Sequence, residues 1–291
     1  MPTLSKKLVI IGNGFDLFHG LPTKYSRFKD YLEKNYNSFF ATLSKYFPND
    51  LLWSSFEEAL AELDYSEIED ENSCYLIGYG DENWRDSANH DYQYMIEESL
   101  SFAIKIPDYL KKWICTIDTN ASPTLSNPII DKNNLYINFN YTDTLEKVYN
   151  IPESNIIYIH GKALRDDKLV IGHHYLDQMI SKLQYKGDDF RIAEGKERII
   201  SYFRTTYKDT NTIISKNKSF FESLSQIDEL FIYGHSLSDI DYEYFETINK
   251  CVPKNCLWHI SYHDTDDQQR ASYLLQKLGI VNHTLYSTQQ K

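Results

Sequence analysis

Short, continuous apolar runs recur along the chain and predict the strands of a buried sheet. The first run, residues 8–11, is rich in branched side chains and is stopped by Gly12, which is typical of a strand covered on both faces in a parallel sheet. Similar runs lie at residues 135–139, 156–159, 169–171, 230–233 and 257–261, and a weaker one lies at 281–286. Six or seven strands would form one mostly parallel sheet.

Two longer stretches show helical spacing instead. Between residues 25 and 122, aromatic and aliphatic side chains such as Tyr25, Phe28 and Leu32 recur on one helical face, and no strand-like run interrupts them. Residues 176–226 form a second helical block, which is polar and partly basic. The pattern therefore predicts helices that interrupt the sheet.

Several shorter signals refine these blocks. Ser54 and Glu57 stand at the spacing of a capping box, so a helix is expected to begin there. The acidic stretch 65–82 is expected to be a loop. Residues 142–149 and 242–248 are expected to be helices that follow strands.

Together these patterns predict an α/β fold with a Rossmann-type, mostly parallel sheet and helical insertions. The nucleotide-binding core would comprise residues 1–24, 123–175 and 227–291. Residues 25–122 and 176–226 would be the two insertions, which we expect to cap the carboxyl edge of the sheet. Ligands bind at that edge in open α/β sheets.

Composition narrows the classes of partner. The chain has 291 residues, a hydrophobic fraction of 42% and a net charge of −12. The hydrophobic fraction is sufficient for a sizeable core, and the acidic surface repels polyanions, so we expect no nucleic acid as a partner. A small nucleotide remains compatible with this net charge, because a few hydrogen-bond donors in a local pocket are enough to hold it.

The location follows from cysteine usage and from the apolar runs. The cysteines at 74, 115, 251 and 256 are scattered, which favours reduced thiols. No run approaches the roughly 20 apolar residues of a membrane span, and the early run 8–11 is too short for a signal-peptide core. We therefore expect a cytoplasmic protein without a membrane partner.

A glycine turn after the first predicted strand is the first candidate for binding chemistry. The turn consists of Gly12, Asn13, Gly14, Phe15 and Asp16. Its glycines allow close approach to a ligand, and its amides could bind a phosphate. A dehydrogenase fingerprint would place a third glycine where Leu17 stands, so a standard hydride-transfer enzyme is disfavoured.

Four segments together resemble the sirtuin family. Residues 12–22 resemble its nucleotide loop, in which Gly-Ala-Gly is followed at the same spacing by Gly-Ile-Pro. Residues 139–143 resemble its strand-end asparagine motif, 160–161 its catalytic His-Gly, and 234–237 its Gly-Thr/Ser-Ser-Leu loop. All four occur in the sirtuin order, and each lies at a predicted strand end. This resemblance implies a sirtuin-like fold that binds NAD.

The chain is also similar, more closely, to the bacterial abortive-infection AbiH family. The similarity is carried by residues 12–23, 138–146 and 233–241 and extends over nearly the whole chain. It implies a role in antiphage defence together with a sirtuin-like fold.

Asn140 and His160 are the candidate catalytic residues for cleavage of NAD. The nicotinamide–ribose bond breaks with charge developing on the ribose, so the reaction needs an oriented water or hydroxyl more than a strong acid. Asn140 could orient water or the nicotinamide amide, and His160 could act as a base. Alternatively, Asn140 caps the helix that follows, and His160 is a structural histidine.

Further candidate cofactor-binding residues are Asp16, His235, Ser236 and Asp239. Asp16 could bind ribose, accept turn amides or stabilise the next helix. The other three follow the strand that ends at 233 and could face a second phosphate or the adenosine ribose. Alternatively, Ser238 or Asp239 simply caps the next helix.

No metal site is expected. His259 and His263 have the spacing of helical metal ligands but lie on or beside a predicted strand, where four residues span about 13 Å. His173 and His174 would point to opposite faces of an extended segment. The sirtuin zinc module is absent, because no cysteine lies between residues 161 and 234. This departure argues against protein deacetylation.

These observations leave three hypotheses. The first is an NAD glycohydrolase that acts in abortive infection, with NAD as its substrate. The second is a nucleotide sensor or interaction module without turnover, and the third is an ADP-ribosyltransferase. A phage component or a partner defence protein could bind the chain, and homo-oligomerisation would be a natural switch.

Overall fold

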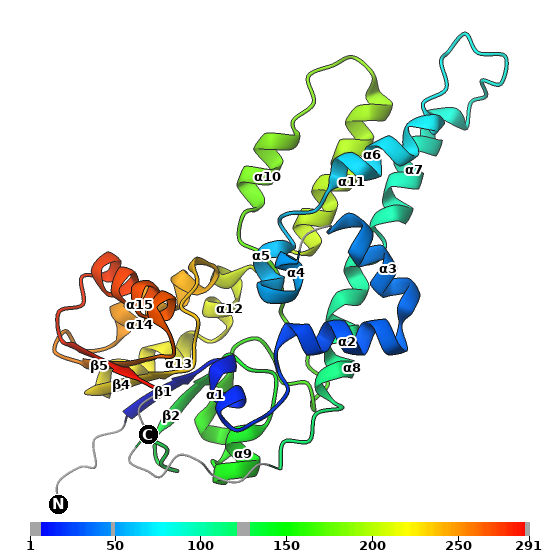
Figure 1. The fold of residues 1–291 in the computed structure, drawn as a ribbon. Helices are drawn as coiled ribbons and strands as arrows, with labels where there is room; N and C mark the ends of the chain where they lie inside the picture. The colour runs from blue at the N-terminus through cyan, green and yellow to red at the C-terminus, as the bar shows by residue number, and fades with distance from the viewer. Residues whose placement is uncertain (1–6, 48–49, 121–128, 289–291) are drawn as a thin grey trace, which may run out of the picture. The chain divides into compact units, whose positions relative to one another are not determined.

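The computed structural model describes residues 7–47, 50–120 and 129–288 (Figure 1). The chain divides into two compact units. The sheet unit comprises Met1–Lys24, Lys111–Val170 and Asp209–Lys291, and the helical unit comprises Tyr25–Leu110 and Ile171–Lys208. The insertion boundaries expected from the sequence stay a prediction, and the one at 122/123 lies outside the described residues.

In the described part of the chain, the sheet has six parallel strands in the order β3-β2-β1-β4-β5-β6. The strands are β1 (Lys7–Ile11), β2 (Leu135–Asn138), β3 (Ile156–Tyr158), β4 (Glu229–Tyr233), β5 (Leu257–Tyr262) and β6 (His283–Ser287). This is the strand order of Rossmann folds, so the predicted α/β class is confirmed. The order reverses between β1 and β4, which places the topological switch point there.

Alternate side chains of strands β1 to β4 enter two separate cores. Leu8 and Ile10 of β1 pack in one core with residues of α13–α15, whereas Val9 and Ile11 pack in the other with residues of α1 and α9. The helices of the sheet unit are α1 (Asn13–Phe18), α9 (Thr144–Tyr149), α12 (Thr210–Lys216), α13 (Lys218–Ser223), α14 (Tyr242–Cys251) and α15 (Thr265–Leu278). Burial on both faces explains why the strands are continuous apolar runs.

Short 3-10 helices η3 (Glu153–Asn155), η4 (Leu224–Gln226) and η5 (Asp239–Asp241) complete the unit's connections. The predicted strand at 169–171 is wrong: these residues form no strand. Val170 instead donates its amide to the His160 carbonyl at 2.9 Å and accepts a hydrogen bond from the Tyr141 hydroxyl at 2.8 Å. An apolar run therefore covers the turn after β3 and does not extend the sheet.

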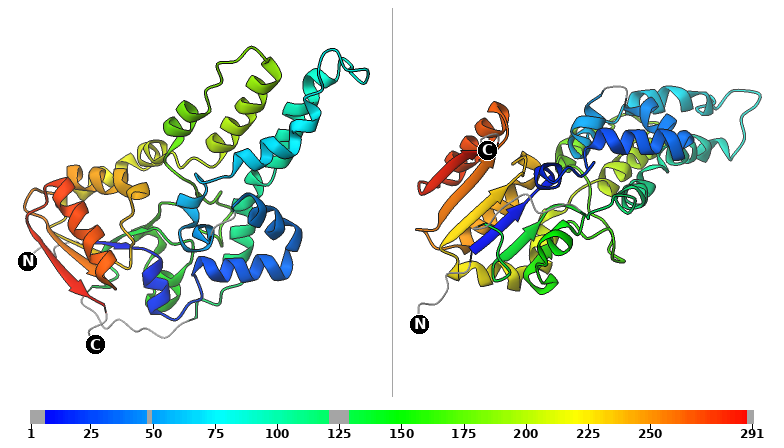
Figure 2. Two further views of the ribbon diagram at one scale, coloured as in Figure 1. Left: turned by 45° about the horizontal axis from the view of Figure 1, so that its top comes forward. Right: turned by 60° about the horizontal axis from the view of Figure 1, so that its bottom comes forward.

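Both stretches predicted to be helical are confirmed as helical, although residues 209–226 of the second stretch, with α12 and α13, belong to the sheet unit. The helical unit has two parts. Its first part contains α2 (Tyr25–Asn35), α3 (Asn37–Tyr46), α4 (Leu51–Ser54), α5 (Phe56–Ala59), α6 (Tyr65–Asn72), η1 (Ser73–Tyr75), α7 (Ala88–Leu100), η2 (Ala103–Lys105) and the start of α8 (Ile106–Ile114). Its second part contains α10 (Leu176–Leu183) and α11 (Phe190–Thr205). Helices α7 and α11 lie side by side (Figures 1 and 2).

Close packing of α7 and α11 depends on Gly195. A Cβ atom there would lie 2.4 Å from the Tyr92 ring of α7, so only glycine fits. In the same unit, the Tyr202 hydroxyl of α11 donates to the Leu60 carbonyl at 2.9 Å. No helix in the described ranges combines the length and apolar character needed to cross a membrane.

Two local predictions in the helical unit need correction. A helix, α5, does begin at the predicted place, but its N-cap is Ser55 and no side-chain hydrogen bond caps it. Ser54 is instead the last residue of α4, and its hydroxyl donates to the Leu51 carbonyl. The acidic stretch is partly helical, because Asp64 caps α6 by accepting the Glu67 amide at 3.1 Å and Ile68 is fully buried. The Asp64 cap and the buried Ile68 side chain stabilise this short helix despite its polar composition.

Candidate functional site

The glycine turn after β1 packs directly against the turn after β4. Gly14 donates its amide to the Gly234 carbonyl at 2.7 Å, and Gly12 donates to Tyr233 at 3.1 Å. A Cβ atom on Gly14 would lie 2.7 Å from the Gly234 Cα, and one on Gly12 would lie 2.7 Å from the His235 Cα. The glycines therefore allow two backbones to meet at the switch point.

The backbone amides that make these hydrogen bonds are the ones that we expected, from the sequence, to bind a phosphate. The amides of Gly12 and Gly14 donate across to the β4 turn, and Phe15 donates to the Gly12 carbonyl at 2.9 Å. Asn13 is exposed, and its side-chain amide donates to the Thr23 carbonyl at 3.1 Å. Phosphate binding by this turn stays a prediction, with Asn13 as its exposed member.

Asp16 is buried and links α1 to the segment that follows β2. Its carboxylate accepts the Thr142 hydroxyl at 2.6 Å and the Thr144 hydroxyl at 2.7 Å. Burial raises the pKa of Asp16 to about 6, although the hydrogen bonds from Thr142, Thr144 and Asn140 oppose the shift. These threonines were missed from the sequence, because nothing local pairs them with Asp16.

Asn140 occupies the gap between the turns after β2 and β1. Its side-chain amide donates to the Gly12 carbonyl at 3.0 Å, and its backbone amide donates to the Asn138 side chain at 2.8 Å. Asn138 in turn donates to the Thr142 carbonyl at 3.3 Å. The helix cap of α9 is Asp143, so the capping alternative for Asn140 is wrong.

His160 lies in the tight turn that follows β3. The next residue, Gly161, has φ +87°, a conformation that favours glycine. The His160 Nε2 atom is 3.7 Å from the Asp241 carboxylate, and its ring meets the Phe139 ring edge-on at 5.2 Å. The turn thus directs an imidazole toward a carboxylate from η5.

His235 reaches the same carboxylate from the turn after β4. Its Nε2 atom is 3.4 Å from Asp241, and its Nδ1 atom accepts the Leu237 amide at 2.9 Å. Phe139 lies against this ring too, at 4.3 Å. The group formed by His160, His235, Asp241 and Phe139 is hereafter called the histidine–aspartate cluster.

Ser236 and Asp239, the other candidates from this turn, lie outside the cluster. Ser236 is exposed, and its carbonyl accepts from Arg270 at 2.8 Å. Asp239 is exposed and pairs with Lys277 at 3.4 Å. Asp241 was missed from the sequence, although a second acid two residues after Asp239, just before a helix, was a readable signal.

The remaining histidines do not gather into a metal site. The described residues contain no group of three His, Cys, Asp or Glu side chains that could hold a metal ion. His259 lies on β5 and stacks on Phe231 at 4.4 Å. In the helical unit His173 is buried, and burial lowers its pKa to about 4.

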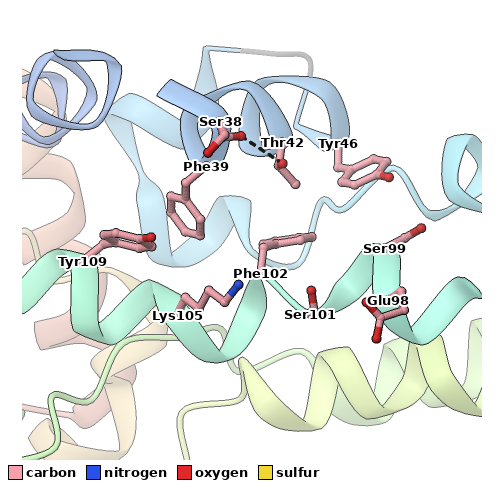
Figure 3. A pocket seen from close by; sticks show the side chains of 10 residues that line it. All are labelled: Ser38, Phe39, Thr42, Tyr46, Glu98, Ser99, Ser101, Phe102, Lys105 and Tyr109. Carbon is pink, nitrogen blue, oxygen red and sulfur yellow. Dashed lines mark hydrogen bonds between the residues drawn. The ribbon is translucent and has the colours of Figure 1, made fainter. Parts of the chain in front are cut away.

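A pocket of about 290 Å³ lies within the helical unit. Figure 3 shows aromatic rings and hydroxyl groups around it, with Phe39 and Tyr109 in contact at 4.2 Å between ring centroids. It is lined by Ser38, Phe39, Thr42, Tyr46, Glu98, Ser99, Ser101, Phe102, Lys105 and Tyr109. None of the candidate catalytic or cofactor-binding residues lines this pocket.

Comparison with known proteins identifies the family. No curated protein and no solved structure matches the chain significantly. The family model described as "Bacteriophage abortive infection AbiH" matches residues 8–262, a span that includes the glycine turn, Asn140 and the whole histidine–aspartate cluster. The chain therefore belongs to the bacteriophage abortive infection AbiH family.

Proposed function

We propose that this abortive-infection protein binds NAD at the carboxyl edge of its sheet and cleaves the nicotinamide–ribose bond, in the cytoplasm of the infected cell. Family membership supports the role in abortive infection. The chemistry is our inference from the residues that meet at the switch point. The sirtuin-like order of those residues belongs to the same proposal.

One observation carries the proposal. The ends of four neighbouring strands, β3, β2, β1 and β4, bring His160, Asn140, Gly12 and His235 to one edge of a Rossmann-ordered sheet. Asn140 contacts Gly12 directly, and both histidines face Asp241. An amide and a carboxylate-flanked imidazole at the carboxyl edge of such a sheet are suited to cleavage of this bond.

The reaction would proceed as hydrolysis. The bond between the ribose C1′ atom and the nicotinamide nitrogen breaks, and its electron pair leaves with neutral nicotinamide. The oxygen of a water molecule bonds to C1′, and the proton it loses passes to the His160 imidazole. Asn140 retains its side-chain carbonyl oxygen with which to orient the water or the nicotinamide amide.

Incubation of the purified full chain with NAD, with and without lysate of phage-infected cells, tests the proposal. We expect nicotinamide and free ADP-ribose in equal amounts. Asn140→Asp and His160→Gln, each with wild-type circular dichroism, should lose this activity by at least about 100-fold. Asp266→Asn, an exposed change on α15, is the matched control and should retain it. NAD consumption at the wild-type rate by both active-site variants would contradict the assignment.

A nucleotide sensor without turnover is the second candidate. Burial of the candidate catalytic residues favours it, because Asn140 is 6% and His160 is 3% exposed. The hydrogen bonding of the glycine turn also favours it, because the backbone amides of that turn already donate within the protein. Calorimetry that shows NAD binding without release of nicotinamide would support it. Release of nicotinamide with ADP-ribose attached to protein or nucleic acid would instead indicate ADP-ribosyl transfer.

A further inference from the structure

We propose that Asp241 is the positioning residue of His160, and that it is shared with His235, so that the two histidines and one carboxylate handle a proton as a unit. The catalytic part of this inference rests on the proposed NAD cleavage. The arrangement of the three residues does not.

The geometry places Asp241 between the two rings. Its Oδ1 atom is 3.7 Å from His160 Nε2, and its Oδ2 atom is 3.4 Å from His235 Nε2. All three residues are buried, with exposed fractions of 3% for His160, 7% for His235 and 6% for Asp241. A carboxylate removed from water in this way is stabilised by positive charge close to it.

The backbone fixes the orientation of His235. Its Nδ1 atom accepts the Leu237 amide at 2.9 Å, so the neutral ring carries its proton on Nε2, the atom that faces Asp241. Leu237 has φ +54°, which is unfavourable for a branched residue and is held by the surrounding turn. A strained turn thus anchors one ring, and that ring faces one oxygen of the carboxylate.

Charge balance then couples the two histidines. One carboxylate balances one imidazolium, so His160 and His235 compete for a single additional proton. The aromatic rings beside His160 are Phe139, Tyr141 and Tyr244, at 5.2, 6.4 and 5.7 Å. These rings supply no charge to balance an imidazolium, because phenols are neutral near pH 7, whereas the Asp241 carboxylate does.

During hydrolysis, His160 would become positively charged as it takes the proton from water. Asp241 would stabilise that charge and hold the ring in place without itself becoming protonated. Loss of the carboxylate should therefore lower kcat about 10- to 100-fold and leave KM nearly unchanged, because the substrate need not touch Asp241.

The test combines this kinetic readout with one that needs no substrate. In protein labelled with ¹³C-histidine, the ring signals of His160 and His235 are assigned by their loss in His160→Gln and His235→Asn and are followed against pH. In Asp241→Asn both histidines should titrate at lower pH, by about one unit or more. In His235→Asn, which keeps an acceptor near the Nδ1 position, His160 should titrate at higher pH. Asp266→Asn should change neither.

These opposite shifts keep the inference falsifiable. Unmoved titrations in Asp241→Asn would overturn it, and should that variant not fold, an unmoved His160 in His235→Asn would overturn it equally. If the titrations shift but the wild type consumes no NAD, the shared carboxylate stands and the proposed NAD cleavage fails. If NAD is cleaved but kcat is unchanged in Asp241→Asn, the positioning role is overturned alone.

Discussion

Buried polar groups are organised differently in the sheet unit and in the helical unit. In the sheet unit they lie directly after strands, as Asn140 does after β2 and His160 after β3, and they are mainly connected by hydrogen bonds. In the helical unit the fully buried Lys208 instead pairs with Glu57 of α5 at 2.5 Å. Strand ends gather polar groups for a site, whereas the Lys208–Glu57 ion pair joins two segments that are 151 residues apart in sequence.

The largest expected effect would break the ion pair of the helical unit. Lys208→Met removes the buried ammonium group that pairs with Glu57 and should lower the free energy of unfolding by about 3–5 kcal/mol. The double variant Lys208→Met with Glu57→Gln should recover most of this loss. Urea denaturation measures both.

The control is the partly exposed pair Lys196–Glu69, whose atoms are 2.6 Å apart. Lys196→Met should cost about 0–1 kcal/mol, because water screens the remaining charge. Equal losses for Lys196→Met and Lys208→Met would show that burial does not distinguish the two pairs.

Next in size is the close approach of turns in the sheet unit. Gly234 has φ +62°, and a Cβ atom there would lie 2.3 Å from the Phe15 amide nitrogen. Gly279, the cap of α15, has φ +66° but has no atom within 4 Å of such a Cβ atom among the described residues. Gly234→Ala should therefore destabilise by about 2–4 kcal/mol and Gly279→Ala by only about 1 kcal/mol. Similar melting temperatures for the two variants would contradict the close approach of the two backbones.

Asp16 gives a smaller, pH-dependent effect. Because its pKa is raised to about 6, the folded protein binds this proton more tightly than the unfolded chain does. Its contribution to stability is complete below the ordinary value of 3.8 and is lost as pH rises through 6. The wild type should therefore gain about 1 kcal/mol between pH 7 and pH 5 relative to Asp16→Asn. Parallel stability curves for the two proteins over this range would rule out the raised pKa.

The smallest effect compares the capping of α6, which the sequence did not predict, with the predicted cap at Ser54, which the structure lacks. Asp64→Ala removes the cap of α6 and should cost about 1 kcal/mol. Ser54→Ala removes no cap and should change stability by less than about 0.5 kcal/mol. Thermal melts of both variants would show whether Ser54 has an unrecognised capping role.

The sheet could be predicted because strands buried on both faces, such as 8–11, are continuous apolar runs. The run 169–171 shows the limit of that reasoning, since burial alone does not distinguish a strand from a segment that covers a turn. Helical character was readable from spacing, but the start of α6 depended on one hydrogen bond that the Asp64 side chain accepts from the Glu67 amide.

Within the site, His160 and Asn140 could be singled out because each follows a strand next to a recognisable motif. For Asp241 the sequence offered only an acid just before a helix, and its contacts with two rings from different strand ends could not be predicted. The partners of Asp16 were hidden for the same reason, since Thr142 lies 126 residues away. Side chains that are distant in sequence and are brought together only by the strand order produce no local sequence pattern.

The position of β1 between β2 and β4 has a consequence for how the protein folds. Gly12 cannot donate to Tyr233, nor Gly14 to Gly234, until the strand at Glu229–Tyr233 exists. Strand β1 is therefore synthesised well before this partner, which lies more than 200 residues later, and such high contact order slows folding. The cluster at the sheet edge forms only after Asp241 has been synthesised, so a nascent chain carries no assembled site.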